Sequence, residues 1–235
     1  IQLQAKSFKY FLSNIVLDQL SYEVLELIAK QNDVFIFSGV IRDFLTGNYE
    51  FSRDFDCVVN GAFLKDSSII DYLRNSTYKL NSFGGLKIKR QNLVIDIWKL
   101  QDTWGIKEMK TSINPNSLIK SAFFNFSAIV YDFKREKFIY DENFCKFLLT
   151  KTMDVVYEEN PNIPLCLVNI YHYNHKYMFS ISLKMAGWVK RHYSYKMDLE
   201  SIQIIHFGRV IYPQIEVESF INEIIEKYDV QNRLE

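Results

Sequence analysis

The stretch at residues 34–59 constrains the fold of this chain more than any other part of the sequence. It begins with an apolar, β-rich run (34–37), passes through Ser38-Gly39 and continues as a helical pattern up to the next glycine. A second apolar run, at residues 51–59, has the composition of a buried strand. A strand, a tight turn, a helix and a second strand in this order predict a mixed sheet with flanking helices.

The second predicted strand carries two aspartates, Asp54 and Asp56, where a buried strand would have apolar residues. Side chains alternate along a strand, so we expect both carboxylates on one side of the sheet and Phe55 on the other. Two neighbouring negative charges are strongly unfavourable in a protein interior unless a cation lies between them or solvent reaches them. Because oxygen ligands prefer hard cations, the pattern predicts a Mg²⁺ site that Mn²⁺ could also occupy.

The turn at Ser38-Gly39 has the features of a phosphate-binding site. Its small residues lie between a predicted strand and a predicted helix, where backbone N–H groups and the helix dipole can approach an anion. Arg42, in the first turn of that helix, could bind a triphosphate, or it could form an ion pair with Asp43 or Asp54 that orders the loop. We interpret Asp43 as a structural acceptor rather than as a catalyst.

A third carboxylate, Asp96, lies in the apolar run LVIDIW (93–98). On a strand next to Asp54 and Asp56 it would complete a group of three carboxylates, whereas on an edge strand it would simply face solvent. Three carboxylates beside a phosphate-binding turn are typical of metal-assisted phosphoryl or nucleotidyl transfer. The first alternative makes Asp54, Asp56 and Asp96 the catalytic, metal-binding residues.

Hydrophobic periodicity predicts the remaining elements. The expected helices are at residues 8–29, 67–75, 165–192 and 213–228, and the expected strands are at 83–89, 93–100 and 123–132, the first two as a hairpin. The patterns change from mixed to purely helical along the chain. We therefore predict the α+β class, with a mixed front domain at residues 1–144 and a helical rear domain at residues 145–235.

The charge balance and the cysteines exclude several classes of protein. Lys and Arg total 28, as do Asp and Glu, so the net charge provides no long-range attraction to nucleic acid or to a membrane. Cys57, Cys145 and Cys166 lack the spacing of a zinc site or a disulfide framework, which favours a reducing, cytoplasmic location. No apolar run approaches the roughly 18 residues that span a bilayer, so we expect no membrane partner.

Two motifs of the front domain resemble those of a known family. FSGVIRDFLTG (37–47) followed by RDFDCVV (53–59) looks like the head domain of class II CCA-adding enzymes and bacterial poly(A) polymerases, within the DNA polymerase beta nucleotidyltransferase superfamily. KSAFFNFSAIVYD (120–132) is weakly similar to a later stretch of that domain, and residues 160–182 have the outline of its neck helix. The resemblance implies a nucleotidyltransferase-type mixed sheet with flanking helices, followed by a smaller, all-helical, neck-like domain.

The sequence departs from the family's pattern at several positions. Ser38 replaces the first glycine of Gly-Gly-x-Val-Arg-Asp. The paired arginines of the later stretch fall on Ser121 and Ala122, which leaves Lys120 as the nearest cation. In the neck helix the positions of the family's arginines hold other residues: Cys166, Asn169 and His172. The metal and triphosphate end is therefore retained, while base recognition is altered or lost.

The resemblance implies a metal-dependent nucleotidyltransferase that moves a nucleoside monophosphate from an NTP to a hydroxyl acceptor, with RNA as one acceptor, and releases pyrophosphate. The residues that it implies for nucleotide binding are Ser38, Gly39, Arg42, Asp43 and Lys120. The altered motifs leave a second interpretation, a catalytically lapsed module that binds a nucleotide, RNA or a protein partner. A small molecule or a protein as the acceptor is a third.

Two further patterns have both a functional and a structural interpretation. His172 and His175 lie three residues apart on one helix face and could hold a metal ion, although the surrounding tyrosines favour aromatic packing. Two basic clusters could contact nucleic acid, with a solvated face as the default. These clusters are Lys87, Lys89 and Arg90, and Lys190, Arg191 and His192.

Overall fold

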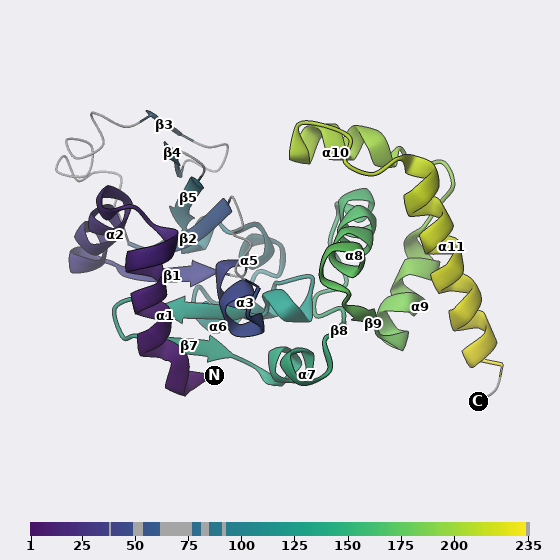
Figure 1. The fold of residues 1–235 in the computed structure, drawn as a ribbon, viewed down its shortest axis with the longest axis horizontal. Coiled ribbons are helices and arrows are strands. Elements are labelled where there is room, and N and C mark those ends of the chain that lie inside the picture. Colours follow the sequence, from purple (N-terminus) through teal and green to yellow (C-terminus); the bar gives the residue numbers. More distant parts are fainter. Residues whose placement is uncertain (38, 49–53, 62–76, 81–84, 91–92, 234–235) are drawn as a thin grey trace. The chain divides into compact units, whose positions relative to one another are not determined.

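A computed structural model describes residues 1–37, 39–48, 54–61, 77–80, 85–90 and 93–233 of the chain (Figure 1). The elements of the first half are α1 (Ala5–Phe11), α2 (Gln19–Gln31), β1 (Asp33–Phe37), α3 (Gly39–Thr46), β2 (Asp54–Asn60), β3 (Thr77–Leu80), β4 (Leu86–Arg90), β5 (Leu93–Lys99), α5 (Trp104–Glu108) and α6 (Pro115–Lys120). Those of the second half are β6 (Ile129–Asp132), β7 (Lys137–Tyr140), α7 (Glu142–Thr150), β8 (Thr152–Met153), α8 (Ile163–Tyr177), β9 (Ser180–Ile181), α9 (Leu183–His192), α10 (Leu199–Phe207) and α11 (Gln214–Gln231).

The chain divides into two compact units. The first, which we call the head unit, consists of Ile1–Ala122 and Phe126–Leu148. The second, the rear unit, consists of Phe123–Asn125 and Leu149–Glu235. The domain boundary predicted after residue 144 lies within α7, and it stays a prediction.

The head unit contains a seven-stranded mixed sheet with the strand order β3-β4-β5-β2-β1-β6-β7. Among these strands, β2 and β5 pair in parallel, and every other neighbouring pair is antiparallel. The middle of the sheet is therefore formed by β5, β2 and β1, which carry most of the residues predicted for the site. The mixed sheet with flanking helices that the sequence predicts is confirmed.

Helices cover both faces of this sheet. On one face, the ring of Phe8 in α1 packs against Tyr131 of β6 and Phe44 of α3, with centroids 4.8 and 5.1 Å away. On the opposite face, α5 and α6 contribute Ile106 and Leu118 to a buried apolar cluster. The other members of that cluster are Phe35, Val58, Leu100 and Val130. We call this second side of the sheet the α5/α6 face.

The first helices form where the sequence predicts them. The stretch at residues 8–29 is a helix pair, in which α1 continues into a π-helical turn (Leu12–Val16) before α2 begins. Asp18 caps α2 by accepting a hydrogen bond from the backbone N–H of Ser21. α3 ends at Thr46 and is followed by Gly47, whose φ of +72° is a conformation that glycine adopts without strain.

The stretch at residues 123–132 forms a strand only from Ile129 onwards, which corrects the sequence-based expectation. Asn125 interrupts it, because its backbone N–H donates to the Asp154 carbonyl oxygen. The Asn125 side-chain amide also donates to the Thr152 carbonyl oxygen and accepts from the Asp154 N–H. Hydrogen bonds to residues so far along the chain are invisible to a local pattern of β-rich residues.

The expected helix at residues 165–192 is two helices, α8 and α9, separated by the short strand β9. Met178 ends α8 in a left-handed conformation, with a φ of 56°. Ser182 then caps α9 by accepting a hydrogen bond from the Met185 N–H. The predicted helix at residues 67–75 lies outside the described residues.

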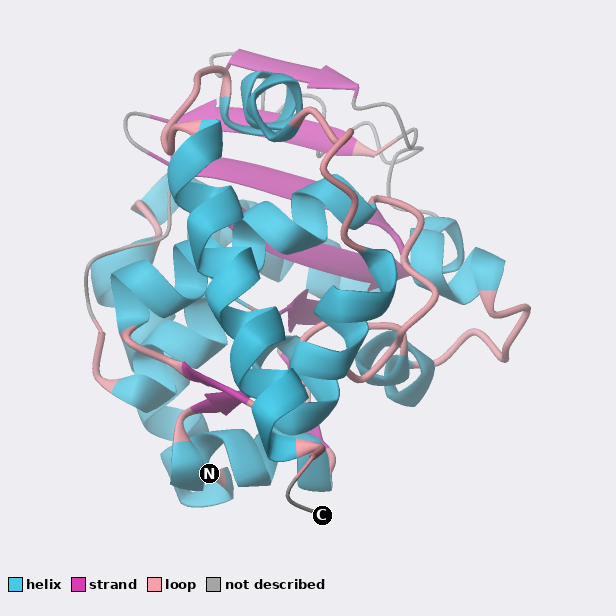
Figure 2. Cartoon of the chain, turned by 90° about the vertical axis from the view of Figure 1, so that its right-hand side faces the viewer, coloured by secondary structure: helices cyan, strands magenta, loops and turns pink. Residues whose placement is uncertain are grey.

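The rear unit consists of α8 to α11 and a small parallel sheet of β8 and β9 (Figure 2). The expected all-helical character therefore describes the bulk of the unit, with these two short strands in addition. α10 has no counterpart among the predicted elements. Across the residues that the structure describes, no helix is long and apolar enough to cross a membrane.

Candidate functional site: an acidic row across β2 and β5

Two of the carboxylates predicted for the site lie opposite one another on neighbouring strands. In the register of the parallel β2–β5 pair, Asp56 is the partner of Asp96, and in the β1–β2 pair it is the partner of Phe37. Cross-strand partners project from the same face of a sheet, and Phe37 packs against the cluster of the α5/α6 face. Asp96 is therefore on an interior strand of that face, not on an edge strand.

Lys87 of β4 extends this row beyond Asp96. β4 and β5 form the predicted hairpin, and their antiparallel register makes Lys87 the partner of Asp96. The Lys87 Nζ lies 2.8 Å from Asp96 Oδ2, and the two side chains are 38% and 21% exposed. Asp96 thus takes part in an ion pair that solvent still partly screens. We call the residues Lys87, Asp96 and Asp56 the acidic row.

The negative charge of Asp56 affects the pKa of the next residue along β2, Cys57. Burial raises the pKa of the Cys57 thiol well above its ordinary range, and the negative charge of Asp56 raises it further. Cys57 is fully buried on the opposite face of the sheet. It therefore stays a neutral thiol and is not a metal ligand of the acidic row.

The N-terminus of α3 is close in sequence to the residue of β1 that pairs with Asp56. α3 begins at Gly39, two residues after Phe37, the cross-strand partner of Asp56. The first N–H groups of a helix have no partner within the helix and favour a bound anion. The strand, turn and helix predicted from residues 34–47 are thus observed, while Ser38 itself lies outside the described residues.

Arg42 is buried in an ion pair with Asp43, one of the two alternatives that the sequence leaves. Its Nε and Nη2 atoms lie 2.8 and 2.7 Å from Asp43 Oδ1, and the two side chains are only 4% and 5% exposed. The Arg42 guanidinium also lies over the ring of Phe126, 5.5 Å from its centroid. Both residues of the pair lie within α3, and a direct role of Arg42 in phosphate binding stays a prediction.

The carboxylate oxygens of Asp56 and Asp96 suit a divalent cation that prefers oxygen ligands. β2 begins at Asp54, whose backbone pairs with Val94 and whose side chain lies outside the described residues. Within the described part of the chain, no group of three or more His, Cys, Asp or Glu side chains could hold a metal ion. Asp56 and Asp96 nevertheless offer oxygen ligands on adjacent strands, which is the chemistry that Mg²⁺ and Mn²⁺ prefer.

The sequence assigns Lys87 to a basic cluster and misses its contact with Asp96. The signal is present in the hairpin, where only residues 91–92 separate β4 from β5. With so short a connection Arg90 opposes Leu93, and counting outwards by three pairs places Lys87 opposite Asp96. Lys120, the cation implied for the nucleotide, is the exposed last residue of α6.

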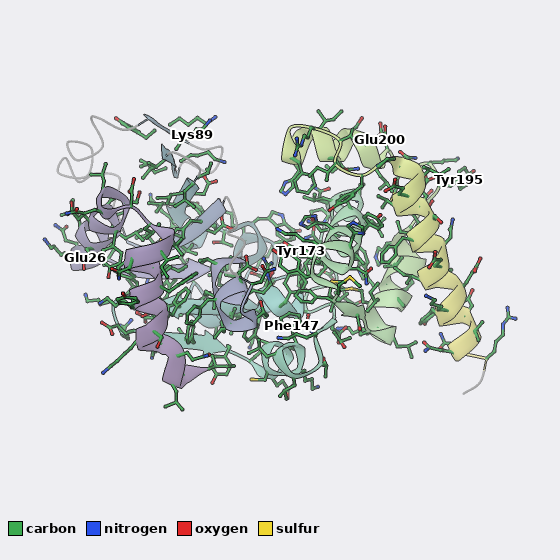
Figure 3. All side chains as sticks on the ribbon, viewed as in Figure 1. Glu26, Lys89, Phe147, Tyr173, Tyr195 and Glu200 are labelled. Atoms are coloured by element: carbon green, nitrogen blue, oxygen red, sulfur yellow. The ribbon has the colours of Figure 1, made fainter. Side chains whose placement is uncertain are left out.

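The histidines of α8 lie in an aromatic cluster, which is the interpretation that the sequence favours. The Nδ1 atom of His172 lies 2.8 Å from the Tyr212 hydroxyl oxygen. His175 stacks on Tyr171 with ring centroids 5.6 Å apart. Tyr173, labelled in Figure 3, adds an edge-on contact to His172 at 5.2 Å. These contacts give both imidazole rings a packing role within the rear unit.

The positive charges of the basic cluster in α9 are balanced by acidic residues of the rear unit. Lys190 forms an ion pair with Asp229, and Arg191 Nη2 lies 2.8 Å from Glu158 Oε2. In the cluster of β4, Lys89 has an exposed side chain (Figure 3). The α9 cluster therefore has the solvated, structural character that the sequence makes the default.

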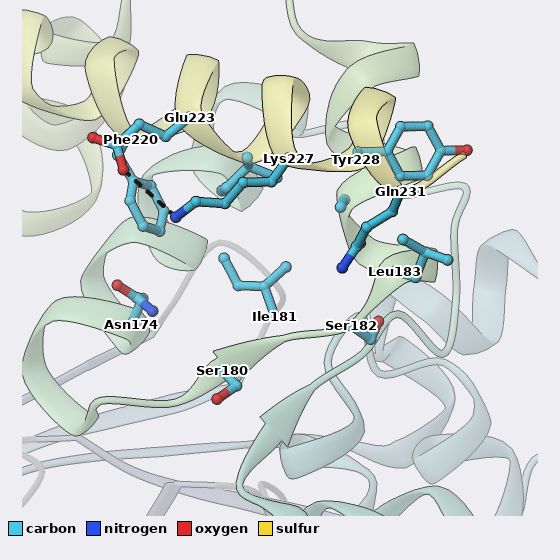
Figure 4. A pocket seen from close by; sticks show the side chains of 12 residues that line it. Asn174, Ser180, Ile181, Ser182, Leu183, Phe220, Glu223, Lys227, Tyr228 and Gln231 are labelled. Atoms are coloured by element: carbon cyan, nitrogen blue, oxygen red, sulfur yellow. Dashed lines mark ion pairs between the residues drawn. The ribbon is translucent and has the colours of Figure 1, made fainter. Parts of the chain in front are cut away.

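The rear unit also contains a pocket of about 500 Å³, lined by residues of α8, β9, α9 and α11 (Figure 4). Its walls include the apolar side chains of Ile181 and Phe220. The Nζ atom of Lys227 lies 3.8 Å from Glu223 Oε2, and both side chains are mostly exposed. Exposed ion pairs of this kind contribute little to binding or stability. None of the residues predicted for the site lines this pocket.

The mixed sheet, the parallel β2–β5 pair and the helix that follows β1 define the class of fold: the head unit has a nucleotidyltransferase fold. Solved structures with a similar fold are CCA-adding enzymes and tRNA nucleotidyltransferases. A CCA-adding enzyme in complex with CTP aligns at a TM-score of 0.65 with 13% identity, over 94% of this chain and 54% of that chain. The Thermotoga maritima CCA-adding enzyme complexed with tRNA aligns at 0.64 with 13% identity, over 95% and 55%.

A tRNA nucleotidyltransferase complexed with a primer tRNA and an incoming ATP analogue aligns at a TM-score of 0.60 with 16% identity, over 88% of this chain and 60% of that chain. The chain therefore spans about half the length of these proteins. No protein-family profile and no curated protein sequence matches it. The resemblance to the CCA-adding enzyme head is thus confirmed for the fold.

Proposed function

We propose that this chain is a metal-dependent nucleotidyltransferase that moves a nucleoside monophosphate from an NTP to a hydroxyl acceptor and releases pyrophosphate. The observation that supports this most directly is the pairing of Asp56 with Asp96 on adjacent interior strands. That pairing brings two carboxylates together on the α5/α6 face, and α3 begins two residues after Phe37, the cross-strand partner of Asp56. Carboxylates next to a helix N-terminus suit a metal-bound polyphosphate.

Asp54, Asp56 and Asp96 are the proposed metal ligands and catalytic residues. When bound there, Mg²⁺ supplies positive charge against the nucleotide phosphates and acidifies the acceptor hydroxyl. The hydroxyl oxygen forms a bond to the α-phosphorus while the bond from that phosphorus to the bridging oxygen breaks, and pyrophosphate leaves. Asp96 accepts the hydroxyl proton in this scheme.

The proposed nucleotide contacts come from the start of α3 and from α6. Backbone N–H groups at Ser38 and Gly39 bind the β- and γ-phosphates, and Lys120 adds a positive charge. Because Arg42 is buried against Asp43, we assign this pair to holding the first turn of α3 in place. The pair thereby orients the N–H donors without contacting the phosphates itself.

RNA is the proposed acceptor class, since the protein of similar fold described with a primer is a tRNA nucleotidyltransferase. We also expect a cytoplasmic location from the free cysteines. The alternative is a module that binds nucleotide, RNA or a protein without catalysis. The burial of Arg42 and the ion pair of Asp96 with Lys87 favour this alternative, because in both cases a charged group that could contact a substrate is paired with another side chain instead.

Transfer of label from α-labelled NTPs to RNA, in the presence of Mg²⁺ or Mn²⁺, tests the proposal. We expect transfer by the unmodified chain and a loss of at least about a hundredfold in Asp56→Asn and Asp96→Asn. Asp102→Asn is the matched control, because Asp102 also lies in a partly exposed ion pair, 2.9 Å from Lys107 Nζ. No transfer by the unmodified chain to RNA, protein or small-molecule acceptors would favour the non-catalytic alternative.

A further inference from the structure

The head unit contains a pocket of about 440 Å³ on the α5/α6 face, lined by residues of β1, β2, β6 and β7 and by the segment 113–116. Asp33 and Asn60, which are cross-strand partners, lie in its wall. Asp33 precedes Phe37 by four residues, and Asn60 follows Asp56 by four. At about 3.3 Å per residue, the pocket is about 13 Å from the acidic row along the strands. It is therefore a separate site.

Arg135 is anchored in this pocket by two carboxylates. Its Nη1 atom lies 2.8 Å from Asp132 Oδ2 and 3.3 Å from Asp33 Oδ1. The Asp132 side chain is only 2% exposed, and its other oxygen accepts a hydrogen bond from the Arg135 backbone N–H. Within the described part of the chain, the Nε and Nη2 atoms of Arg135 have no hydrogen-bond partner. The guanidinium is thus held in place while its remaining N–H groups are available to a ligand.

Other hydrogen-bond donors in the pocket wall are also unused. Lys137 is exposed and forms no ion pair with any residue that the structure describes. The exposed side-chain amides of Asn60 and Asn116 have no hydrogen-bond partner among those residues either. A wall with so many unused N–H groups favours a ligand that is rich in acceptor oxygens and nitrogens.

The charges in the wall favour an anionic group at one end of the ligand. The Asp132 carboxylate is buried and neutralised by its pair with Arg135. The exposed charged side chains are Arg135, Lys137 and Asp33, which sum to one positive charge. Guanidinium and ammonium groups side by side bind phosphate well. The Asp33 carboxylate, at 32% exposure, suits hydroxyl donors of the same ligand.

The remainder of the wall is apolar. Phe35, Ile113, Pro115 and Ile139 line it, and Ile113 is 52% exposed although it is a large aliphatic residue. Apolar side chains flanked by amides suit a nucleobase, whose faces are apolar and whose edges accept and donate hydrogen bonds. The volume lies within the range of pockets that bind small molecules.

We infer that this pocket is a second nucleotide-binding site, which takes a nucleoside 5′-monophosphate group, either free or as one residue of an RNA strand. Arg135 and Lys137 bind the phosphate, Asp33 accepts hydrogen bonds from ribose hydroxyls, and Asn60 and Asn116 contact the edge of the base. The inference goes beyond the proposed function, because the pocket is not lined by the acidic row and its chemistry requires no metal ion.

Isothermal titration calorimetry of the whole chain in EDTA, with AMP, GMP, CMP and UMP, tests the inference. We expect at least one of these nucleotides to bind once per chain, at least about tenfold more tightly than inorganic phosphate. A 5′-phosphorylated RNA oligonucleotide of the same base distinguishes the two sources. If it binds at least as tightly, the occupant is an RNA residue; if it binds more weakly, the occupant is the free nucleotide.

Two variants locate the binding. Lys137→Glu reverses an exposed charge that has no partner among the described residues, so the variant should fold and bind the nucleotide at least about tenfold more weakly. Arg135→Lys keeps a cation beside Asp132 but loses the Nε and Nη2 donors, and a similar loss is expected. Lys6→Glu is the matched control, because Lys6 is an exposed residue of α1 on the opposite face of the sheet and should leave binding unchanged.

The results separate this inference from the proposed function, which is tested by label transfer with metal. No binding of any nucleotide, phosphate that binds as tightly as the nucleotides, or binding that persists in both Lys137→Glu and Arg135→Lys would overturn the inference and leave the proposed function intact. Asp56→Asn should lose label transfer and keep the metal-free binding. Loss of both in this variant would locate the nucleotide at the acidic row and overturn the inference alone.

Discussion

The buried ion pair of Arg42 with Asp43 allows a quantitative prediction about the stability of the head unit. Arg42→Met removes the guanidinium but keeps a side chain of similar length that can pack against Phe126. Both charged side chains are about 95% buried, and two nitrogens of Arg42 contact one oxygen of Asp43 at 2.8 and 2.7 Å. Removal of one partner leaves the Asp43 charge in the interior without this cation.

The expected loss in the free energy of unfolding is about 3–5 kcal/mol, the range for a broken buried pair. Lys9→Met breaks an ion pair of the same length at a partly exposed site, and it should cost less than about 1 kcal/mol. The double variant Arg42→Met/Asp43→Leu removes both charges and should regain at least about 2 kcal/mol of the loss, since an apolar pair needs no desolvation of charge.

Urea unfolding followed by tryptophan fluorescence measures these differences. In a Trp188→Phe background the two remaining tryptophans, Trp98 and Trp104, both lie in the head unit, so the signal reports that unit alone. The midpoint should shift while the slope with urea stays constant. If Arg42→Met loses no more than Lys9→Met, the pair does not stabilise α3 as a buried pair should.

Three further predictions concern other parts of the chain. Gln203 is fully buried and bonds four backbone groups, one at Leu199 where α10 begins and three at Ile211 and Tyr212. Gln203→Leu should therefore destabilise the rear unit by about 1–3 kcal/mol in urea, and a loss below about 0.5 kcal/mol would contradict this. Burial raises the pKa of the Cys166 thiol to about 12 from an ordinary 9.0, so the unfolded chain ionises first and stability should fall as the pH rises between these values. Cys166→Ala should show a smaller fall over that window in urea titrations at each pH. A Cβ at Gly105 would lie 2.4 Å from the Ser121 Cβ, so Gly105→Ala should lower the thermal midpoint by several degrees, whereas an unchanged midpoint would mean that α5 and α6 shift apart at no cost.

The parts of the fold that follow from local patterns are the ones that the sequence predicts. Strand alternation and the turn before α3 identify β1, α3 and β2, because each depends on residues that are close in sequence. The hairpin of β4 and β5 is predicted for the same reason. Its register also contains the Lys87–Asp96 contact, and the two-residue connection between the strands is enough to fix that register.

The features that the sequence did not predict depend on distant residues. Asn125 turns away from a strand because of hydrogen bonds to Thr152 and Asp154. The parallel pairing of β2 with β5 needs a crossover, which no alternation of apolar residues encodes. The burial of Arg42 likewise depends on Phe126, far along the chain. The sequence therefore indicates which residues belong near the site more readily than which partners they take.

The division into units has a consequence for how this protein can change over evolutionary time. The chain passes from one unit to the other after Ala122, after Asn125 and again after Leu148. A single recombination event at any one of these positions would separate one of the two units from part of its own chain. An example is Asn125, which bonds to Thr152 within the rear unit. The two halves are therefore expected to be inherited together, and the exchange of either for another module would require several simultaneous junctions.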